Sequence, residues 1–148
     1  MSHRRIGLGI AAAGIVAVAL ILAVPWWKTA HYSGRYGEIR VLIVDNLHFS
    51  AHFTWATNAD TIKAVRPHVT AADQAVLVRM LGDERGAVAV AAASLLGLLG
   101  KQGEAALRKA AEGPDVRIAI NAKSELIHLE ACRNPAIQNL DRELCPRE

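Results

Sequence analysis

The 148-residue sequence contains no aromatic residue after Trp55. A hydrophobic core in the second part of the chain must therefore be built from alanine, valine, leucine and isoleucine, and these residues favour closely packed helices. The same absence removes the flat side chains on which single-stranded nucleic acid or planar cofactors stack. We therefore expect a helical protein that holds no cofactor.

The folded part of the chain carries no excess charge of either sign. The formal net charge is +3, and Arg4, Arg5 and Lys28 account for all of it. Residues 29–148 contain 14 Lys/Arg against 14 Asp/Glu. A neutral domain lacks the basic stripe that neutralises phosphates, so nucleic acid is excluded as a partner.

Residues 6–24 carry no charged side chain. As a helix, this run would rise about 28 Å, close to the hydrocarbon thickness of a bilayer. Trp26 and Trp27 follow it, at the place where aromatic side chains mark a water–lipid interface. The run exceeds the apolar core of a cleaved signal peptide. The sequence therefore predicts an uncleaved transmembrane anchor over residues 6–27.

The charges beside this run predict its orientation. Arg4 and Arg5 lie directly at the membrane boundary, which places the N-terminus inside and the folded domain outside. We therefore expect a single-pass protein of the inner (cytoplasmic) membrane with a periplasmic domain. The expected organisation is a cytoplasmic N-terminus over 1–5, the anchor over 6–27, a juxtamembrane linker over 28–57 and a helical domain over 58–148.

Capping signals predict a series of short helices after the linker. Thr70 and Asp73 resemble a capping box, Gly100 suits a helix C-terminus, and Asp115 suits an N-cap. The predicted helices cover residues 60–66, 70–81, 87–99, 103–112, 115–131 and 135–144. Within the linker, the apolar run 39–44 fits either a strand or a helix, and the spacing of its neighbours weakly favours a helix.

Sliding the chain over itself by 30 residues aligns two of the predicted helices. The matched pairs include Ala89 with Ala119, Val90 with Ile120, Ala92 with Ala122, Ser94 with Ser124, and Leu96 with Leu126. Such matches at helical spacing predict a core-facing stripe that is repeated. A chance match between two helices rich in alanine and leucine is the alternative.

The second unit of this repeat begins Asp115-Val-Arg-Ile-Ala119 and continues with Ala122 and Leu126. The two units together, over residues 70–131, resemble the short HEAT-like repeats of bilin lyases. The resemblance implies a right-handed stack of helix pairs that binds another protein. The expected fold is therefore all-α, with an N-terminal transmembrane helix followed by a small α-solenoid of HEAT-like helix pairs.

One set of possible metal ligands precedes the repeat. Asp45, His48 and His52 would share one face if they lay on a single helix, and two histidines four residues apart can bind one metal ion. The set lacks the glutamate of the His-Glu-x-x-His signature. A solvated face is the favoured interpretation, and we expect neither a metal site nor catalytic residues.

Three polar residues lie beside the predicted core face of residues 115–131. If the stack is HEAT-like, Asn121, Glu125 and His128 belong to its inner surface and are the candidate partner-binding residues; an ordinary solvated face is the alternative. Cys132 and Cys145 are the only cysteines. Their even number favours a disulfide, whereas a straight helix over 135–144 would keep them too far apart, so both possibilities stay open.

The sequence thus predicts a membrane-anchored adaptor or accessory subunit that binds a protein and is not an enzyme. Two alternatives remain. One is a metal-dependent enzyme that uses Asp45, His48 and His52, and the other is an anchored inhibitor or immunity-type protein.

Overall fold

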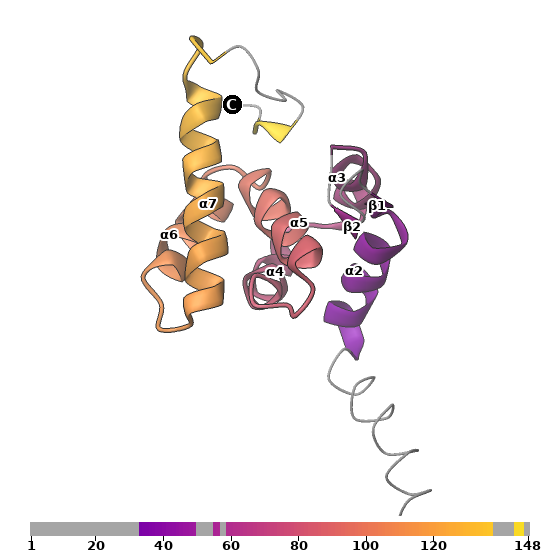
Figure 1. Ribbon diagram of the computed structural model, residues 1–148. Helices are drawn as coiled ribbons and strands as arrows, with labels where there is room; N and C mark the ends of the chain where they lie inside the picture. The colour runs from indigo at the N-terminus through magenta and orange to yellow at the C-terminus, as the bar shows by residue number, and fades with distance from the viewer. Residues whose placement is uncertain (1–32, 50–54, 57–58, 138–143, 147–148) are drawn as a thin grey trace, which may run out of the picture. The chain divides into compact units, whose positions relative to one another are not determined.

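The computed structural model describes residues 33–49, 55–56, 59–137 and 144–146, and most of them are α-helical (Figure 1). The elements, labelled as in Figure 1, are α2 (Gly34–Asp45), β1 (His48–Phe49), β2 (Trp55–Ala56), α3 (Ala59–Val65), η1 (Arg66–His68), η2 (Ala71–Asp73), α4 (Gln74–Met80), α5 (Gly86–Gly97), α6 (Lys101–Ala111) and α7 (Val116–Arg133). The two strands are antiparallel, with His48 opposite Ala56 and Phe49 opposite Trp55. The predicted helical character is therefore present.

The predicted transmembrane helix requires a correction. Among the residues that the structure describes, no helix is both long enough and apolar enough to span a bilayer. Residues 6–27, where the anchor was predicted, lie outside the described residues. The single-pass inner-membrane localisation, the periplasmic domain and the bilayer contact all depended on that helix, so the structure does not support them.

The apolar run 39–44 belongs to helix α2, and the weak preference for a helix is confirmed. Helix α2 buries Tyr36, Ile39 and Ile43, which lie on one face because their spacings are three and four residues. The helix ends at Asp45, and His48 already belongs to strand β1.

Two buried carboxylates connect α2 to the helices that follow. Arg35 donates from Nε to Asp73 Oδ1 across 2.7 Å and from its terminal nitrogen to Oδ2 across 2.9 Å. Asp83 Oδ2 accepts hydrogen bonds from the hydroxyl of Tyr36 at 2.7 Å and from Nε of Arg40 at 2.9 Å. Bidentate and charge-assisted bonds of this kind are the stronger polar contacts in proteins, and here they fix α2 against η2 and against the turn after α4.

Most of the predicted helix boundaries are close to the observed ones. Thr70 and Asp73 form the expected capping box, with the Thr70 amide 2.8 Å from Asp73 Oδ2. Asp115 is the N-cap of α7 and accepts hydrogen bonds from the amides of Arg117 and Ile118. Gly100 has a φ of +67°, a conformation that glycine adopts without steric cost, and α6 begins directly after it.

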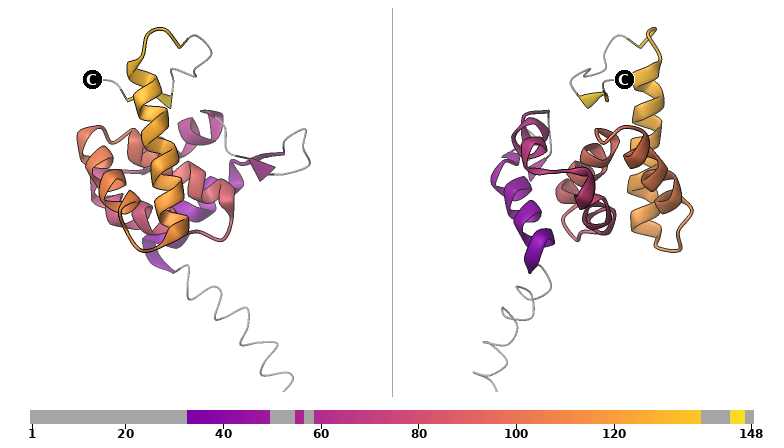
Figure 2. Two further views of the ribbon diagram at one scale, coloured as in Figure 1. Left: turned by 60° about the vertical axis from the view of Figure 1, so that its left-hand side comes forward. Right: turned by 180° about the vertical axis from the view of Figure 1, so that it is seen from behind.

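Helix α5 is the central element of residues 59–133. It packs against α3, α4, α6 and α7, and Figure 2 shows α7 in front of its neighbours in the left view and behind α6 in the right view. Helix α5 contains no charged residue, and its positions from Ala91 to Gly97 are all buried. An uncharged helix of this kind is stable only when other helices cover it, so α5 organises the packing of its neighbours.

The burial of α5 predicts a large effect of truncating Leu96, whose side chain is fully buried. We expect Leu96→Ala to lower the free energy of unfolding by about 2–5 kcal/mol, since it removes apolar contacts and leaves a cavity. Val90 lies in the same helix but is 48% exposed, so Val90→Ala should cost under about 0.5 kcal/mol. Urea denaturation measures both values, and equal losses would contradict the packing of α5.

The Arg35–Asp73 pair predicts a dependence of stability on pH. The Arg35 side chain lowers the pKa of Asp73 from 3.8 to about 2. The folded protein therefore holds the proton less tightly than the unfolded chain. The resulting stabilisation is complete above about pH 4 and is lost as the pH falls towards 2. Because Arg35 is partly exposed, we expect this contribution to be about 1–2 kcal/mol.

Denaturation at pH 5 and at pH 2.5 tests this contribution. The Asp73→Asn variant should be less stable than the parent protein at pH 5, and the difference should shrink at pH 2.5. Asp45 is exposed and serves as a matched control, so Asp45→Asn should leave the pH dependence unchanged. A constant difference between Asp73→Asn and the parent protein at both pH values would contradict the ion pair.

Candidate functional site on helix α7

Helix α7 is the longest described helix, and its two faces differ in chemistry. Its inner face packs against α5 and α6 and buries Ala119, Ala122, Glu125 and Leu129. Glu125 is the exception in this set, because glutamate is almost never fully buried unless it has a partner. The contacts of the buried Glu125 carboxyl group are therefore the first feature of the site.

Glu125 is only 6% exposed and points towards α5. The hydroxyl of Ser94, the one polar side chain of α5, donates a hydrogen bond to Glu125 Oε2 across 3.2 Å. Gly97 leaves the space for the carboxylate, since a Cβ atom there would lie 2.6 Å from Glu125 Oε1. Burial raises the pKa of the Glu125 carboxyl above its ordinary value, and the bonds from His128 and Ser94 oppose that shift.

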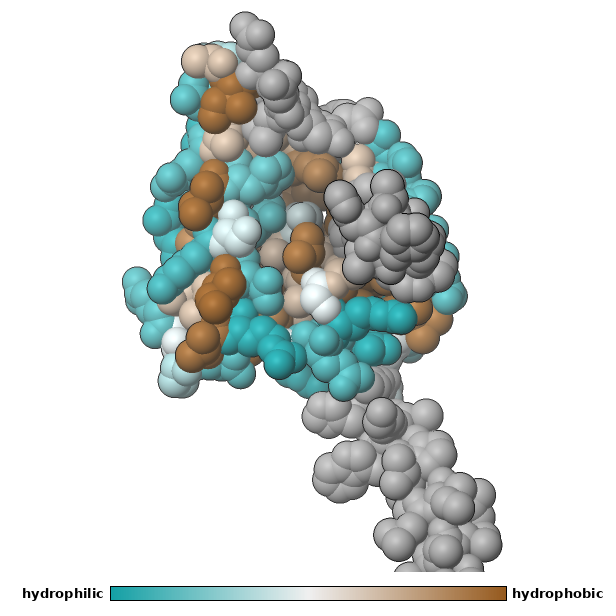
Figure 3. Space-filling view, viewed as in Figure 1, coloured by the Kyte–Doolittle hydropathy of each residue, from teal (hydrophilic) through white to brown (hydrophobic). Residues whose placement is uncertain are grey.

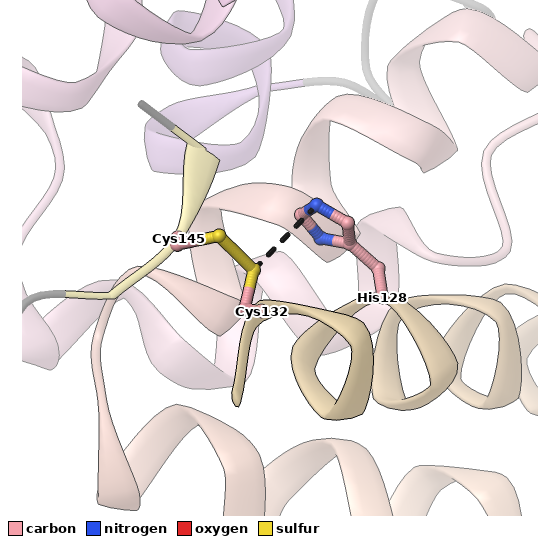
Figure 4. A group of neighbouring side chains, drawn as sticks. All are labelled: His128, Cys132 and Cys145. Carbon is pink, nitrogen blue, oxygen red and sulfur yellow. Dashed lines mark hydrogen bonds between the residues drawn. A yellow bond between two sulfur atoms is a disulfide. The ribbon is translucent and has the colours of Figure 1, made fainter. Parts of the chain in front are cut away.

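His128 lies one turn after Glu125 and extends the polar cluster. Its Nδ1 is 3.2 Å from Glu125 Oε1, and its Nε2 is 3.8 Å from the sulfur of Cys132. Cys132 forms a disulfide with Cys145, and their Cα atoms are 5.6 Å apart (Figure 4). We call the line of Ser94, Glu125, His128, Cys132 and Cys145 the polar relay.

Asn121 lies at another part of the inner side of α7. Its amide donates to the carbonyl of Leu81 at 2.8 Å and to that of Arg117 at 3.1 Å. The bond to Leu81 joins α7 to the turn after α4, whereas Arg117 belongs to α7 itself. Asn121 therefore has a structural role within the domain.

The predicted partner-binding stripe must be corrected in one respect. Glu125 is buried against α5 and is therefore on neither a partner-facing nor a solvated surface. The sequence predicts a core face made only of aliphatic residues, and for that reason it assigns Glu125 to a surface beside the core. The signal that could have located it is Ser94, a single hydroxyl in an uncharged helix, followed three residues later by a glycine.

The outer face of α7 carries the second feature. Val116, Ile120 and Ile127 are 71%, 61% and 68% exposed. Their spacings of four and seven residues place them along one line of the helix, which we call the aliphatic stripe. Figure 3 shows hydrophobic side chains spaced along the α7 side of the molecule with hydrophilic ones between them.

An open groove of about 720 Å³ runs beside this stripe, between α6 and α7. Its lining includes Arg108, Glu112, Val116, Ile120, Lys123 and Leu126. The thirty-residue repeat predicts that Ile120 lies on a core-facing stripe, as does Val90. That prediction is wrong, because both side chains are largely exposed.

The alternative metal site of the sequence analysis is not assembled on one helix. Helix α2 ends at Asp45, His48 lies in β1, and His52 lies outside the described residues. Among the described residues, the donor atoms of His128, Cys132 and Cys145 do lie within 4.8 Å of one another. Both sulfurs are already bonded to each other, so this group is a disulfide beside an imidazole.

The burial of Glu125 predicts the effect of reversing its charge. We expect Glu125→Lys to lower the free energy of unfolding by about 3–5 kcal/mol, because a cation would replace a hydrogen-bonded carboxyl group in the interior. Glu130 lies on the same helix but is exposed, so Glu130→Lys should cost under about 0.5 kcal/mol. Melting temperatures of the two variants compare them directly, and equal values would show that Glu125 faces solvent.

Comparison of the chain with family models, with curated proteins and with solved structures finds no match. The resemblance of residues 70–131 to HEAT-like repeats therefore stays a prediction. What the protein does has to be inferred from the chemistry of α7 itself.

Proposed function

We propose that the helical domain is a protein-binding module that holds an acidic amphipathic helix of a partner protein on the outer face of α7. The observation that carries the proposal is the aliphatic stripe, in which three large side chains are each more than 60% exposed. A stripe on one helix face is the complement of an amphipathic helix, which presents apolar residues at spacings of three and four.

The exposure of the stripe favours a binding role over a structural one. Scattered apolar side chains are normal on a protein surface, whereas aligned ones beside a groove are typical of interaction sites. The opposite face of α7 already forms the contact with α5, so the stripe is not needed for folding. The same helix can therefore hold the domain together and receive a partner.

The charges around the stripe indicate the sign of the partner. Lys123 lies on the same line of α7, between Ile120 and Ile127, and is exposed. Arg108 and Glu112 also line the groove, and Arg108 pairs with Glu104, so Lys123 is the cation that lies on the stripe itself. Acidic residues beside the apolar face of the partner helix would complement Lys123, and basic residues there would be repelled by it.

Photo-crosslinking in cells that produce the protein tests this surface. A photoreactive amino acid placed at Ser124, which is exposed beside the stripe, should join the chain to one partner protein. The crosslinked segment should be an amphipathic helix with acidic residues. The double substitution Ile120→Asp, Ile127→Asp should abolish the crosslink while the melting temperature stays nearly unchanged, because both positions are exposed.

Val41 provides the matched control, since it is an exposed aliphatic residue on α2 and is 56% exposed. Val41→Asp should leave the crosslink intact. Three outcomes would contradict the proposal: a crosslink that survives the double substitution, a crosslink to a basic segment, or a crosslinked product that contains only a second copy of this chain. The identity of that partner would show whether the module serves as an adaptor, an accessory subunit or an inhibitor.

A further inference from the structure

The polar relay places a titratable pair directly against the disulfide. Glu125, His128 and Cys132 follow one another at spacings of three and four residues along α7, so their side chains lie in sequence on one side of the helix. A cysteine beside a histidine that is oriented by a carboxyl group is the arrangement that activates thiols as nucleophiles and as leaving groups.

The contact between His128 and Cys132 can carry a hydrogen bond in one direction only. A disulfide sulfur has no hydrogen, so across the 3.8 Å contact the donor is an N–H group at His128 Nε2. In that arrangement His128 Nδ1, 3.2 Å away, shares a hydrogen bond with Glu125 Oε1, which orients the ring towards the sulfur of Cys132.

The disulfide is also accessible from outside the domain. Both cysteines line an open groove of about 670 Å³, together with Lys101, Glu104 and Arg133. Glu104 is paired with Arg108 and Arg133. The charged side chains of the described lining residues therefore leave an excess of positive charge, which would attract a thiolate or an anionic thiol.

We propose that Cys132–Cys145 is a thiol–disulfide exchange site, at which an external thiol attacks Cys145 and His128 stabilises the Cys132 thiolate that leaves. The attacking thiolate forms a bond to the sulfur of Cys145 as the bond between Cys132 and Cys145 breaks. The electron pair goes to the sulfur of Cys132, which receives the hydrogen bond, and then the proton, from Nε2. A second thiol attacks the mixed disulfide, so two external thiols are oxidised and both cysteines are reduced.

The place of Cys132 in the fold explains why the neighbouring ring matters. Cys132 lies in the last turn of α7, where the carbonyl end of the helix disfavours a negative charge. Without a donor, a thiolate at this position would be a poor leaving group. His128 supplies the donor, and Glu125, held by Ser94, is the positioning residue that orients the ring.

The direct test is the rate at which reduced glutathione opens the disulfide of the full chain at pH 7. His128→Phe keeps a planar ring but removes the N–H group, and we expect it to slow opening roughly tenfold. His68 is exposed in η1 and is not among the residues that line the groove of the disulfide, so His68→Phe should leave the rate unchanged. Mass spectrometry of the trapped intermediate should find glutathione on Cys145.

Two results would overturn the proposal. One is an opening rate for His128→Phe within a factor of two of the parent rate, and the other is glutathione found mainly on Cys132. Circular dichroism verifies that the variant is folded. If it is not, the Cys145→Ser chain provides a second measurement, which is the pH dependence of Cys132 alkylation by iodoacetamide.

In that second measurement, the midpoint of alkylation should lie below that of a free thiol in solution. The Glu125→Gln substitution should move this midpoint, because the ring loses its titratable partner, whereas a purely structural glutamate would leave it in place. Among the residues that the structure describes, the other charged groups that line the groove beside the sulfur are Lys101, Glu104 and Arg133, and they are the same in both chains. A midpoint at or above that of the free thiol would show that the relay does not stabilise the thiolate.

Discussion

Helix α5 has no charged side chain, and its only polar side chain is the hydroxyl of Ser94. A buried hydroxyl without a partner destabilises a fold, and α5 is covered by helices on almost every side. The partner that satisfies it is Glu125 of α7, which fits beside Gly97. This hydrogen bond sets the rotation of α7 about its own axis together with the burial of Ala119, Ala122 and Leu129 on the same face of the helix.

The rotation of α7 has two consequences. On the inner side, Glu125 aligns His128 with the sulfur of Cys132, which completes the polar relay and provides the chemistry of the exchange site. On the outer side, the aliphatic stripe turns towards solvent and becomes a surface on which a partner helix can bind. The two proposed activities use opposite sides of one helix, and neither requires the residues of the other.

Most helix boundaries between residues 59 and 133 could be predicted from the sequence, because local signals set them. The capping box of Thr70 and Asp73 and the N-cap at Asp115 are examples, since each depends only on residues close in sequence. The attachment of α2 could not be predicted, because Arg35 and Asp73 are 38 residues apart. The burial of Glu125 was missed for the same reason: its partner belongs to another helix, and composition alone assigns a glutamate to the surface.

The orientation of α7 is tested most directly by the reactivity of single introduced cysteines. The native disulfide stays intact in this experiment. In the Ile120→Cys and Ile127→Cys variants, a thiol reagent should modify the new cysteine at about the rate of an unfolded peptide. In Ala122→Cys, whose site is fully buried, modification should be about a hundredfold slower, because it requires local opening of the domain. Equal rates at the three positions, or faster modification at position 122, would contradict the orientation and the two proposals that depend on it.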